Sequence, residues 1–248
     1  IHLRGADVTD RLLADDAFLS QHSRVTLIAP AILRSLRLIP TEYLFFYSSR
    51  RRALENQLKQ GSTRGAEIEQ LSRTLNPSLA RLLREGDGTG AIAAYAEYLN
   101  TRSAAYMKLE GEGGSALHVT QTVHEDPFRA ASGYHRIALE VMMALCGSKP
   151  ARIVVNTQNC GFIAEIEAGD IVEVPCQISE DTITPEPCGS LPEAVRGLTL
   201  AVKAYERAAI EAALTGSELT ARKAMLLNPA IGEWEPSQEL LKQLIVHC

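Results

Sequence analysis

Apolar residues recur at helical spacing through most of the chain. The pattern is clearest over residues 65–85 and 191–214, where apolar positions follow one another at intervals of three or four. Further helices are predicted over residues 24–48, 88–107, 127–147, 218–227 and 237–247. Pro30 and Pro40 should each end or kink the helix within 24–48. The chain is therefore expected to be mostly helical.

The 191–214 segment carries signals at both of its ends. Ser190 and Glu193 have the spacing of a capping box around Pro192, which predicts the helix start. Gly216 follows the last apolar position and predicts the helix end.

One block in the middle of the chain is rich in strand-forming residues. Strands are predicted over residues 151–156, 161–166, 170–178 and 181–184. The four residues 167–170, Glu-Ala-Gly-Asp, supply a turn before the third of these strands. Because the strands form one block with helices before and after it, the pattern indicates an α+β fold, mostly helical with one small antiparallel-rich sheet.

Three amide side chains lie where the first predicted strand ends. Asn156, Gln158 and Asn159 place fixed donors and acceptors in front of an apolar segment. Amides of this kind can hold a ligand's hydroxyl groups without adding charge. Asparagine close to glycine is also ordinary turn chemistry, so both interpretations stay open at this point.

Charge and composition exclude several classes of function. A net charge of −5 and a pI near 5.7 argue against a nucleic-acid-binding surface. No apolar run approaches the length of a membrane span, and no signal peptide is expected. The five cysteines form no CxxC pair, which suits reduced thiols in the cytoplasm better than disulfides. No Gly-rich dinucleotide loop and no complete metal motif occurs in the sequence.

Two short segments combine side chains that could carry chemistry. Tyr43 and Tyr47 are four residues apart, on one face of a predicted helix, where tyrosines at the edge of a core are also common. His135 and Arg136 begin another predicted helix, where they could bind an anion or form part of a buried polar contact.

Eight segments together resemble one family. They occur in the order expected for glycoside hydrolase family 4, and most closely for its 6-phospho-β-glucosidase branch. The segments are GADVT, LIPTEYLFFY, STRGAEIEQLS, AAYMKLE, GYHRIALEVMMAL, RIVVNTQNCGFI, DIVEVPC and VKAYERAAIEAALTG…ARKAMLLNP. Because they extend over nearly the whole chain, their joint spacing is far more specific than any single segment.

The resemblance implies that residues 1–248 form the C-terminal catalytic, substrate-binding and oligomerisation domain. Its fold would resemble the C-terminal domain of lactate and malate dehydrogenases. The NAD-binding Rossmann half and the cysteine and histidine that bind Mn²⁺ would lie upstream of Ile1, so no cofactor or metal ligand is expected in this chain. The residues given would be inactive alone, and the whole enzyme would be a cytoplasmic homo-oligomer, dimeric or tetrameric, with no nucleic-acid or membrane partner.

The resemblance also implies an unusual reaction on a phosphorylated glucoside. NAD would oxidise the sugar at C3, a base would remove the C2 proton, and the leaving group would depart by elimination. Matching residues makes Tyr43 the candidate base, with Tyr47 as the alternative, and puts Arg64 near the reacting atoms. The candidate substrate-binding residues are Asn156, Asn159, Tyr106, His135 and Arg136.

Two other functions remain compatible with the sequence. The chain could be the substrate domain of a 2-hydroxy-acid dehydrogenase, which would need a catalytic histidine–aspartate pair that the sequence does not place. It could also be an oligomerisation module without catalytic residues. An upstream Gly-rich βαβ unit in the same polypeptide would favour an enzyme over a module.

Overall fold

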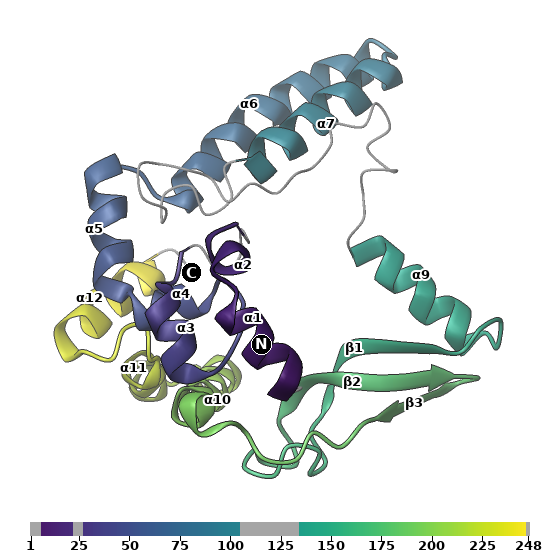
Figure 1. The fold of residues 1–248 in the computed structure, drawn as a ribbon. Helices are drawn as coiled ribbons and strands as arrows, with labels where there is room; N and C mark the ends of the chain where they lie inside the picture. The colour runs from purple at the N-terminus through teal and green to yellow at the C-terminus, as the bar shows by residue number, and fades with distance from the viewer. Residues whose placement is uncertain (1–5, 22–26, 105–133, 247–248) are drawn as a thin grey trace. The chain divides into compact units, whose positions relative to one another are not determined.

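A computed structural model describes residues 6–21, 27–104 and 134–246 of the chain (Figure 1). The chain divides into two compact units, residues 1–130 and residues 131–248. The first unit is entirely helical in its described part, and the second combines helices with a three-stranded sheet. The predicted α+β architecture is therefore confirmed.

Seven helices make up the described part of the first unit. They are α1 (Ala6–Ala14), α2 (Asp16–Gln21), α3 (Pro30–Leu36), α4 (Leu44–Ser48), α5 (Arg50–Gln60), α6 (Arg64–Arg84) and α7 (Gly88–Ala104). Pro30 begins α3, because a proline at the first helical position loses no helical hydrogen bond. Pro40 lies between α3 and α4, so the two prolines divide the predicted 24–48 segment as expected.

The core of the first unit lies among its short N-terminal helices. Phe45 of α4 is fully buried there, and so are Ile28 and Leu33. The guanidinium of Arg52 lies over the Phe45 ring, 5.7 Å from its centroid. Helices α6 and α7 lie side by side as a hairpin, linked by a 3.4 Å hydrogen bond between the Ser72 and Tyr98 hydroxyls (Figure 1).

The second unit places its sheet between helical segments. Its elements are α9 (Tyr134–Leu145), β1 (Ala151–Gln158), β2 (Ile171–Ser179), β3 (Thr182–Pro185), α10 (Glu193–Thr215), α11 (Glu218–Leu227) and α12 (Trp234–Val246). The strands are antiparallel in the order β1-β2-β3, with Val155 opposite Val174. Figure 1 shows the C-terminal end of α9 next to the sheet, and α10 and α11 packed together.

The predicted strand over 161–166 does not form. β1 pairs directly with β2, and residues 159–170 make the connection between them. Within this segment only one isolated bridge occurs, between Ile163 and Gly189. The backbone there is held by a buried side chain and by turns, which take the place of a neighbouring strand.

One face of the sheet is buried and the other is exposed. Val174, Cys176 and Ile178 of β2 are almost completely buried and pack with Ala144 of α9. Val154 on the opposite face is 50% exposed. The alternation is that of an antiparallel strand with one solvated face. Burial also raises the pKa of the Cys176 thiol, because the thiolate would be poorly solvated.

The start of α10 differs from the prediction. Pro192 is the residue before the helix, and no side chain caps it, so the Ser190–Glu193 capping box does not form. The Leu191 N–H instead donates to the Glu165 carboxylate at 3.0 Å, and this bond lowers the pKa of Glu165. The other end agrees with the prediction, since Gly216 has a φ of +66°.

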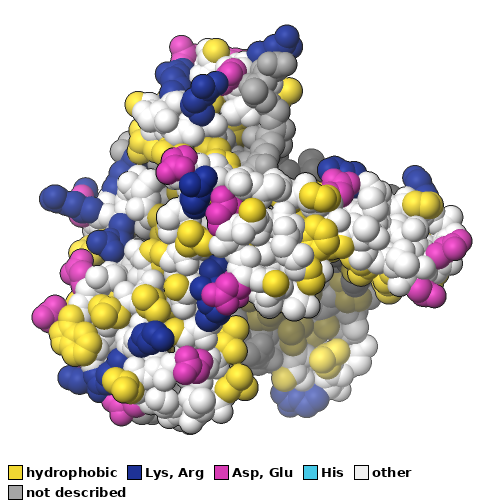
Figure 2. Space-filling view, turned by 90° about the horizontal axis from the view of Figure 1, so that it is seen from below, with side chains coloured by type: hydrophobic (Ala, Val, Ile, Leu, Met, Phe, Trp, Pro, Cys, Tyr) yellow, Lys and Arg dark blue, Asp and Glu magenta, His cyan; other side chains and the backbone are white. Residues whose placement is uncertain are grey.

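The surface mixes charged and apolar side chains. On the face drawn in Figure 2, apolar groups form small clusters between acidic and basic side chains. Within the described ranges, no helix is both long enough and apolar enough to cross a bilayer.

Phe45→Ala should strongly destabilise the first unit, because a fully buried aromatic ring would leave a cavity. We expect a loss of about 3–5 kcal/mol in the free energy of unfolding, measured by chemical denaturation. Leu58→Ala is the control, because this α5 side chain is 72% exposed and should change little. Equal losses in the two variants would contradict the assignment of Phe45 to the core.

Candidate functional site

Helix α4 presents both candidate tyrosines at the surface of the first unit. Tyr43 is the residue just before the helix and is 56% exposed, and Tyr47 is 38% exposed one turn later. Phe45 lies between them in sequence and is fully buried. The buried ring therefore anchors the helix, while the two phenols remain accessible to a ligand.

Arg64 is the first residue of α6. The preceding Thr63 caps the helix by accepting a hydrogen bond of 3.2 Å from the Ala66 N–H. The Arg64 guanidinium donates to the Arg102 carbonyl at the end of α7 and lies 3.8 Å from the Glu67 carboxylate. These contacts hold its side chain, 23% exposed, against the α6–α7 hairpin. Tyr106 lies outside the described residues.

Asn156 and Gln158 lie on the exposed face of the sheet. Asn156 is opposite Glu173, and Gln158 is opposite Ile171, at the end of β1. Among the described residues, neither side-chain amide has a hydrogen-bond partner. Both amides therefore lie on the solvated face of the sheet.

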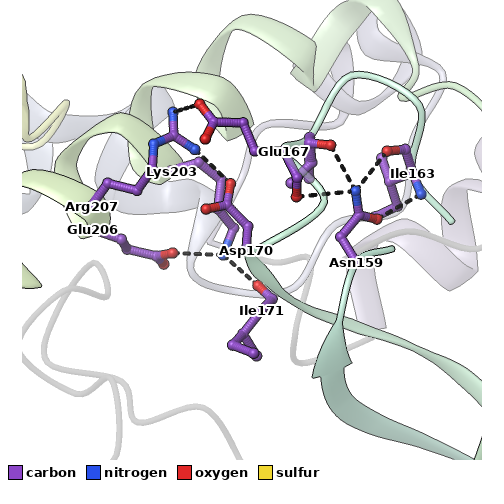
Figure 3. Close-up of polar contacts among 9 residues, drawn as sticks. Asn159, Ile163, Glu167, Asp170, Ile171, Lys203, Glu206 and Arg207 are labelled. Atoms are coloured by element: carbon purple, nitrogen blue, oxygen red, sulfur yellow. Dashed lines mark hydrogen bonds and ion pairs between the residues drawn. The ribbon is translucent and has the colours of Figure 1, made fainter. Parts of the chain in front are cut away.

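Asn159 has the opposite environment, although it is the next residue along the chain. Its side chain is fully buried and bonds to the backbone of its own loop (Figure 3). The Nδ2 group donates to the carbonyls of Ile163 at 3.0 Å and Ile166 at 2.7 Å, while Oδ1 accepts from the Ile163 N–H at 2.8 Å. This side chain therefore stabilises the loop. Its direct contact with the substrate remains a prediction, and its burial does not favour that contact.

A tight turn follows Asn159 directly. The Phe162 N–H donates to the Asn159 carbonyl at 2.8 Å across Cys160 and Gly161. Their φ angles are +45° and +89°, as in a type I′ turn. The Cys160 side chain is exposed at this turn.

The first turn of α9 carries the other predicted pair. Arg136 is an exposed side chain, 3.4 Å from the Glu140 carboxylate one turn later. Such a surface pair is weak and leaves the guanidinium accessible to an anion. The side chain of His135 is outside the described part of the structure.

The predicted site residues divide between the two units. Tyr43, Tyr47 and Arg64 belong to the first unit, with Tyr43 directly before α4 and Tyr47 within it. Asn156 and Asn159 belong to the second unit and lie together at the end of β1.

The described residues do not form a metal centre by themselves. No group of three or more histidine, cysteine, aspartate or glutamate side chains within these ranges could hold a metal ion. The four cysteines among them are free thiols, with Cys176 buried in the sheet core.

Sequence reasoning missed two basic residues that contact the loop after β1. Lys203 and Arg207 lie one turn apart on α10 and bond to Ile171 and Asp170 (Figure 3). Their spacing of four residues was the one sequence feature that could have pointed to them, because it places both cations on a single helix face.

Comparison with known proteins identifies the family. A family model described as "Family 4 glycosyl hydrolase C-terminal domain" matches residues 1–231. The chain therefore belongs to glycosyl hydrolase family 4, of which it contains the C-terminal domain. This result confirms the resemblance found in the sequence.

Relatives and solved structures agree with this assignment. A "Probable 6-phospho-beta-glucosidase" of Bacillus subtilis is 30% identical over 216 residues, which cover 87% of this chain and 41% of the relative. A Thermotoga maritima 6-phospho-beta glucosidase solved with NAD and glucose-6-phosphate has a TM-score of 0.65 at 20% identity, covering 96% of this chain and 47% of that one. A 6-phospho-alpha-glucosidase from gut microorganisms, also solved with NAD and glucose-6-phosphate, has a TM-score of 0.62 at 18% identity, covering 98% and 51%. The structural matches confirm the fold, and the chain spans about two-fifths of the length of the Bacillus subtilis relative.

Asn159→Ala should destabilise the second unit, because it leaves the Ile163 N–H and the Ile166 carbonyl without their buried partner. We expect a loss of about 1–3 kcal/mol in the free energy of unfolding. Asn156→Ala is the matched control, since this side-chain amide has no partner among the described residues. Denaturant titrations that give the same stability for both variants would rule out the loop-building role.

Proposed function

We propose that this chain is the C-terminal half of an NAD- and divalent-metal-dependent 6-phospho-β-glucosidase. The family match over residues 1–231 carries the proposal. Relatives named 6-phospho-beta-glucosidase from Escherichia coli and Thermotoga maritima support it at 25% and 28% identity. Thermotoga maritima structures with a similar fold contain NAD, manganese and glucose-6-phosphate. The preference for β-glucosides over α-glucosides is proposed separately, because one relative is a phospho-alpha-glucosidase.

Tyr43 is proposed as the base that removes the C2 proton of the sugar. Its ring is 56% exposed, and the buried Phe45 anchors the helix that follows it. A free phenol has a pKa of about 10, so the phenolate needs a nearby positive charge. Arg64 is the proposed source of such a charge within this chain, or a contact to the substrate. Bound NAD would supply the oxidation at C3 that acidifies the C2 proton, and its binding site would lie outside this chain.

Asn156, Arg136 and His135 of the second unit, together with Tyr106 of the first unit, are proposed to hold the substrate. The exposed Asn156 amide can exchange hydrogen bonds with sugar hydroxyls. The Arg136 guanidinium can bind a phosphate in a bidentate manner, with His135 beside it in the first turn of α9. Tyr106 and Asn159 complete the proposed set, Asn159 through the shape of its loop.

The whole protein is further proposed to be a cytoplasmic homo-oligomer. Exposed apolar side chains support a homo-oligomer, and α9 contributes Ile137, Leu139, Met142 and Met143 to them. The free thiols of the described cysteines support a cytoplasmic location.

The full-length protein should cleave a chromogenic 6-phospho-β-glucoside when NAD and Mn²⁺ are added. Omitting either NAD or Mn²⁺ should abolish the activity, and the unphosphorylated glucoside should be a poor substrate. The 6-phospho-α-glucoside is the matched control for anomeric preference. Equal cleavage of the phosphorylated and unphosphorylated β-glucosides would refute the phosphosugar specificity.

Tyr43→Phe in the full-length enzyme should lower kcat by about 10²–10⁴-fold, because only the proton-accepting hydroxyl is lost. Substrate affinity should change far less, since the hydroxyl acts chiefly in the transition state. Tyr95→Phe is the control, because this α7 tyrosine is similarly exposed at 48%.

The same assay distinguishes the two tyrosines of α4. If Tyr47→Phe abolishes kcat while Tyr43→Phe retains it, the base lies one helical turn further along the chain. Full kcat in both variants would mean that neither tyrosine is the base.

A further inference from the structure

The connection between β1 and β2 is a compact loop, residues 159–170, which we call the 159–170 loop. Its two ends meet, because the Asn159 N–H donates to the Asp170 carbonyl at 2.7 Å. The Cys160 N–H donates to the Ala168 carbonyl at 3.0 Å, one step further into the loop. The buried Asn159 side chain also bonds to the backbone of Ile163 and Ile166, so the loop is held together by bonds within itself.

Two cationic side chains of α10 bind the C-terminal end of this loop (Figure 3). Arg207 contacts the Asp170 carboxylate at 2.5 Å and the Glu167 carboxylate at 3.3 Å. Lys203, one turn earlier, donates to the Ile171 carbonyl at 2.6 Å. Both contacts join residues more than thirty positions apart in sequence, so they fix the loop to a separate helix.

The Arg207–Asp170 pair dominates this attachment. The Asp170 side chain is only 9% exposed, so its carboxylate is largely removed from water. Arg207 is its one cationic partner among the described residues, and loss of that partner would leave a shielded charge uncompensated. The Glu167 carboxylate is 68% exposed, and its pair with Arg207 contributes little.

Asp170 and Ile171, the residues that α10 binds, lie next to the exposed amides at the end of β1. Gln158 pairs with Ile171 across the two strands, and Asn159 bonds to Asp170. The residues held by Lys203 and Arg207 are therefore the strand partners of the segment that carries these amides.

We propose that Arg207 is a positioning residue for substrate binding. Through Asp170 it holds the 159–170 loop against α10, and thereby fixes the exposed amides of Asn156 and Gln158 for the sugar. The proposal rests on the proposed function, in which the end of β1 faces the phosphorylated glucoside. Arg207 itself touches no substrate in this account.

The test uses the full-length enzyme and the chromogenic 6-phospho-β-glucoside. Arg207→Gln should lower kcat/KM by about 10- to 100-fold, mainly through KM, because the amides lose their alignment. Arg207→Lys should recover part of this loss, since it keeps the charge but not the planar guanidinium. Asp170→Asn should match Arg207→Gln, and the double variant should be no worse than either single variant.

Arg152→Gln is the matched control. Arg152 lies on the same strand, β1, and forms a bidentate pair with Glu186 at 2.8 and 2.7 Å, away from the loop. This variant should keep the kcat/KM of the parent enzyme. The proposal is overturned if Arg207→Gln keeps it too, if both variants lose it equally, or if the Arg207 and Asp170 effects are additive.

Hydrogen exchange of the same proteins separates this proposal from the proposed function. Arg207→Gln should accelerate exchange of the amides of Asn159, Phe162 and Ile163, and Arg152→Gln should not. If the parent enzyme cleaves no phosphoglucoside, the proposed function fails, while faster exchange still supports the attachment through Arg207. Unchanged exchange in Arg207→Gln overturns the attachment itself.

Discussion

The buried amide of Asn159 is the interaction on which the second unit's loop depends. A fully buried amide must find partners for its donors and its acceptor, and here all of them are backbone groups of the same loop. The loop consequently cannot adopt the extended pairing that its apolar residues would otherwise favour. The strand ends, and with them the neighbouring exposed amides, are held at one position.

In the first unit, the position of helix α4 depends in the same way on one buried side chain, Phe45. Helix α4 has only five residues, too few to be stable as an isolated helix. Burial of Phe45 in the core supplies the missing stability, and the same geometry turns Tyr43 and Tyr47 outward. The position of the proposed base is thus a consequence of core packing, since the helix alone would not hold it.

Ion pairs in the second unit differ in their contribution to stability because their exposure to water differs. Asp170 is only 9% exposed, so its partner Arg207 matters, whereas in the other pair Arg152 is 61% exposed and Glu186 is 30% exposed. The Arg152 bond lowers the pKa of Glu186, so the folded form binds that proton less readily than the unfolded chain does. The stabilisation is therefore present above the ordinary pKa of glutamate and is lost as the pH falls through the lowered value.

The sequence predicted the longer helices and the family, whereas α2 and α5 lie outside every helix predicted from it. Apolar spacing alone placed α11 over residues 218–227, with both ends as observed, and proline and glycine marked the ends of α3 and α10. These features depend on near neighbours in the chain, so a local pattern contains them. The motifs around Tyr43 and Asn156 likewise identified the family without any contact being known.

Only the tertiary structure decided which predicted residues are accessible. Asn156 and Asn159 are three residues apart and chemically identical, yet one is exposed and the other is buried. Phe162 and Ile163 have strand-forming side chains but lie in a loop, because Asn159 bonds to the backbone there. Arg207 fastens that loop from 37 positions away. Burial and long-range pairing depend on groups far apart in sequence, and no local pattern records them.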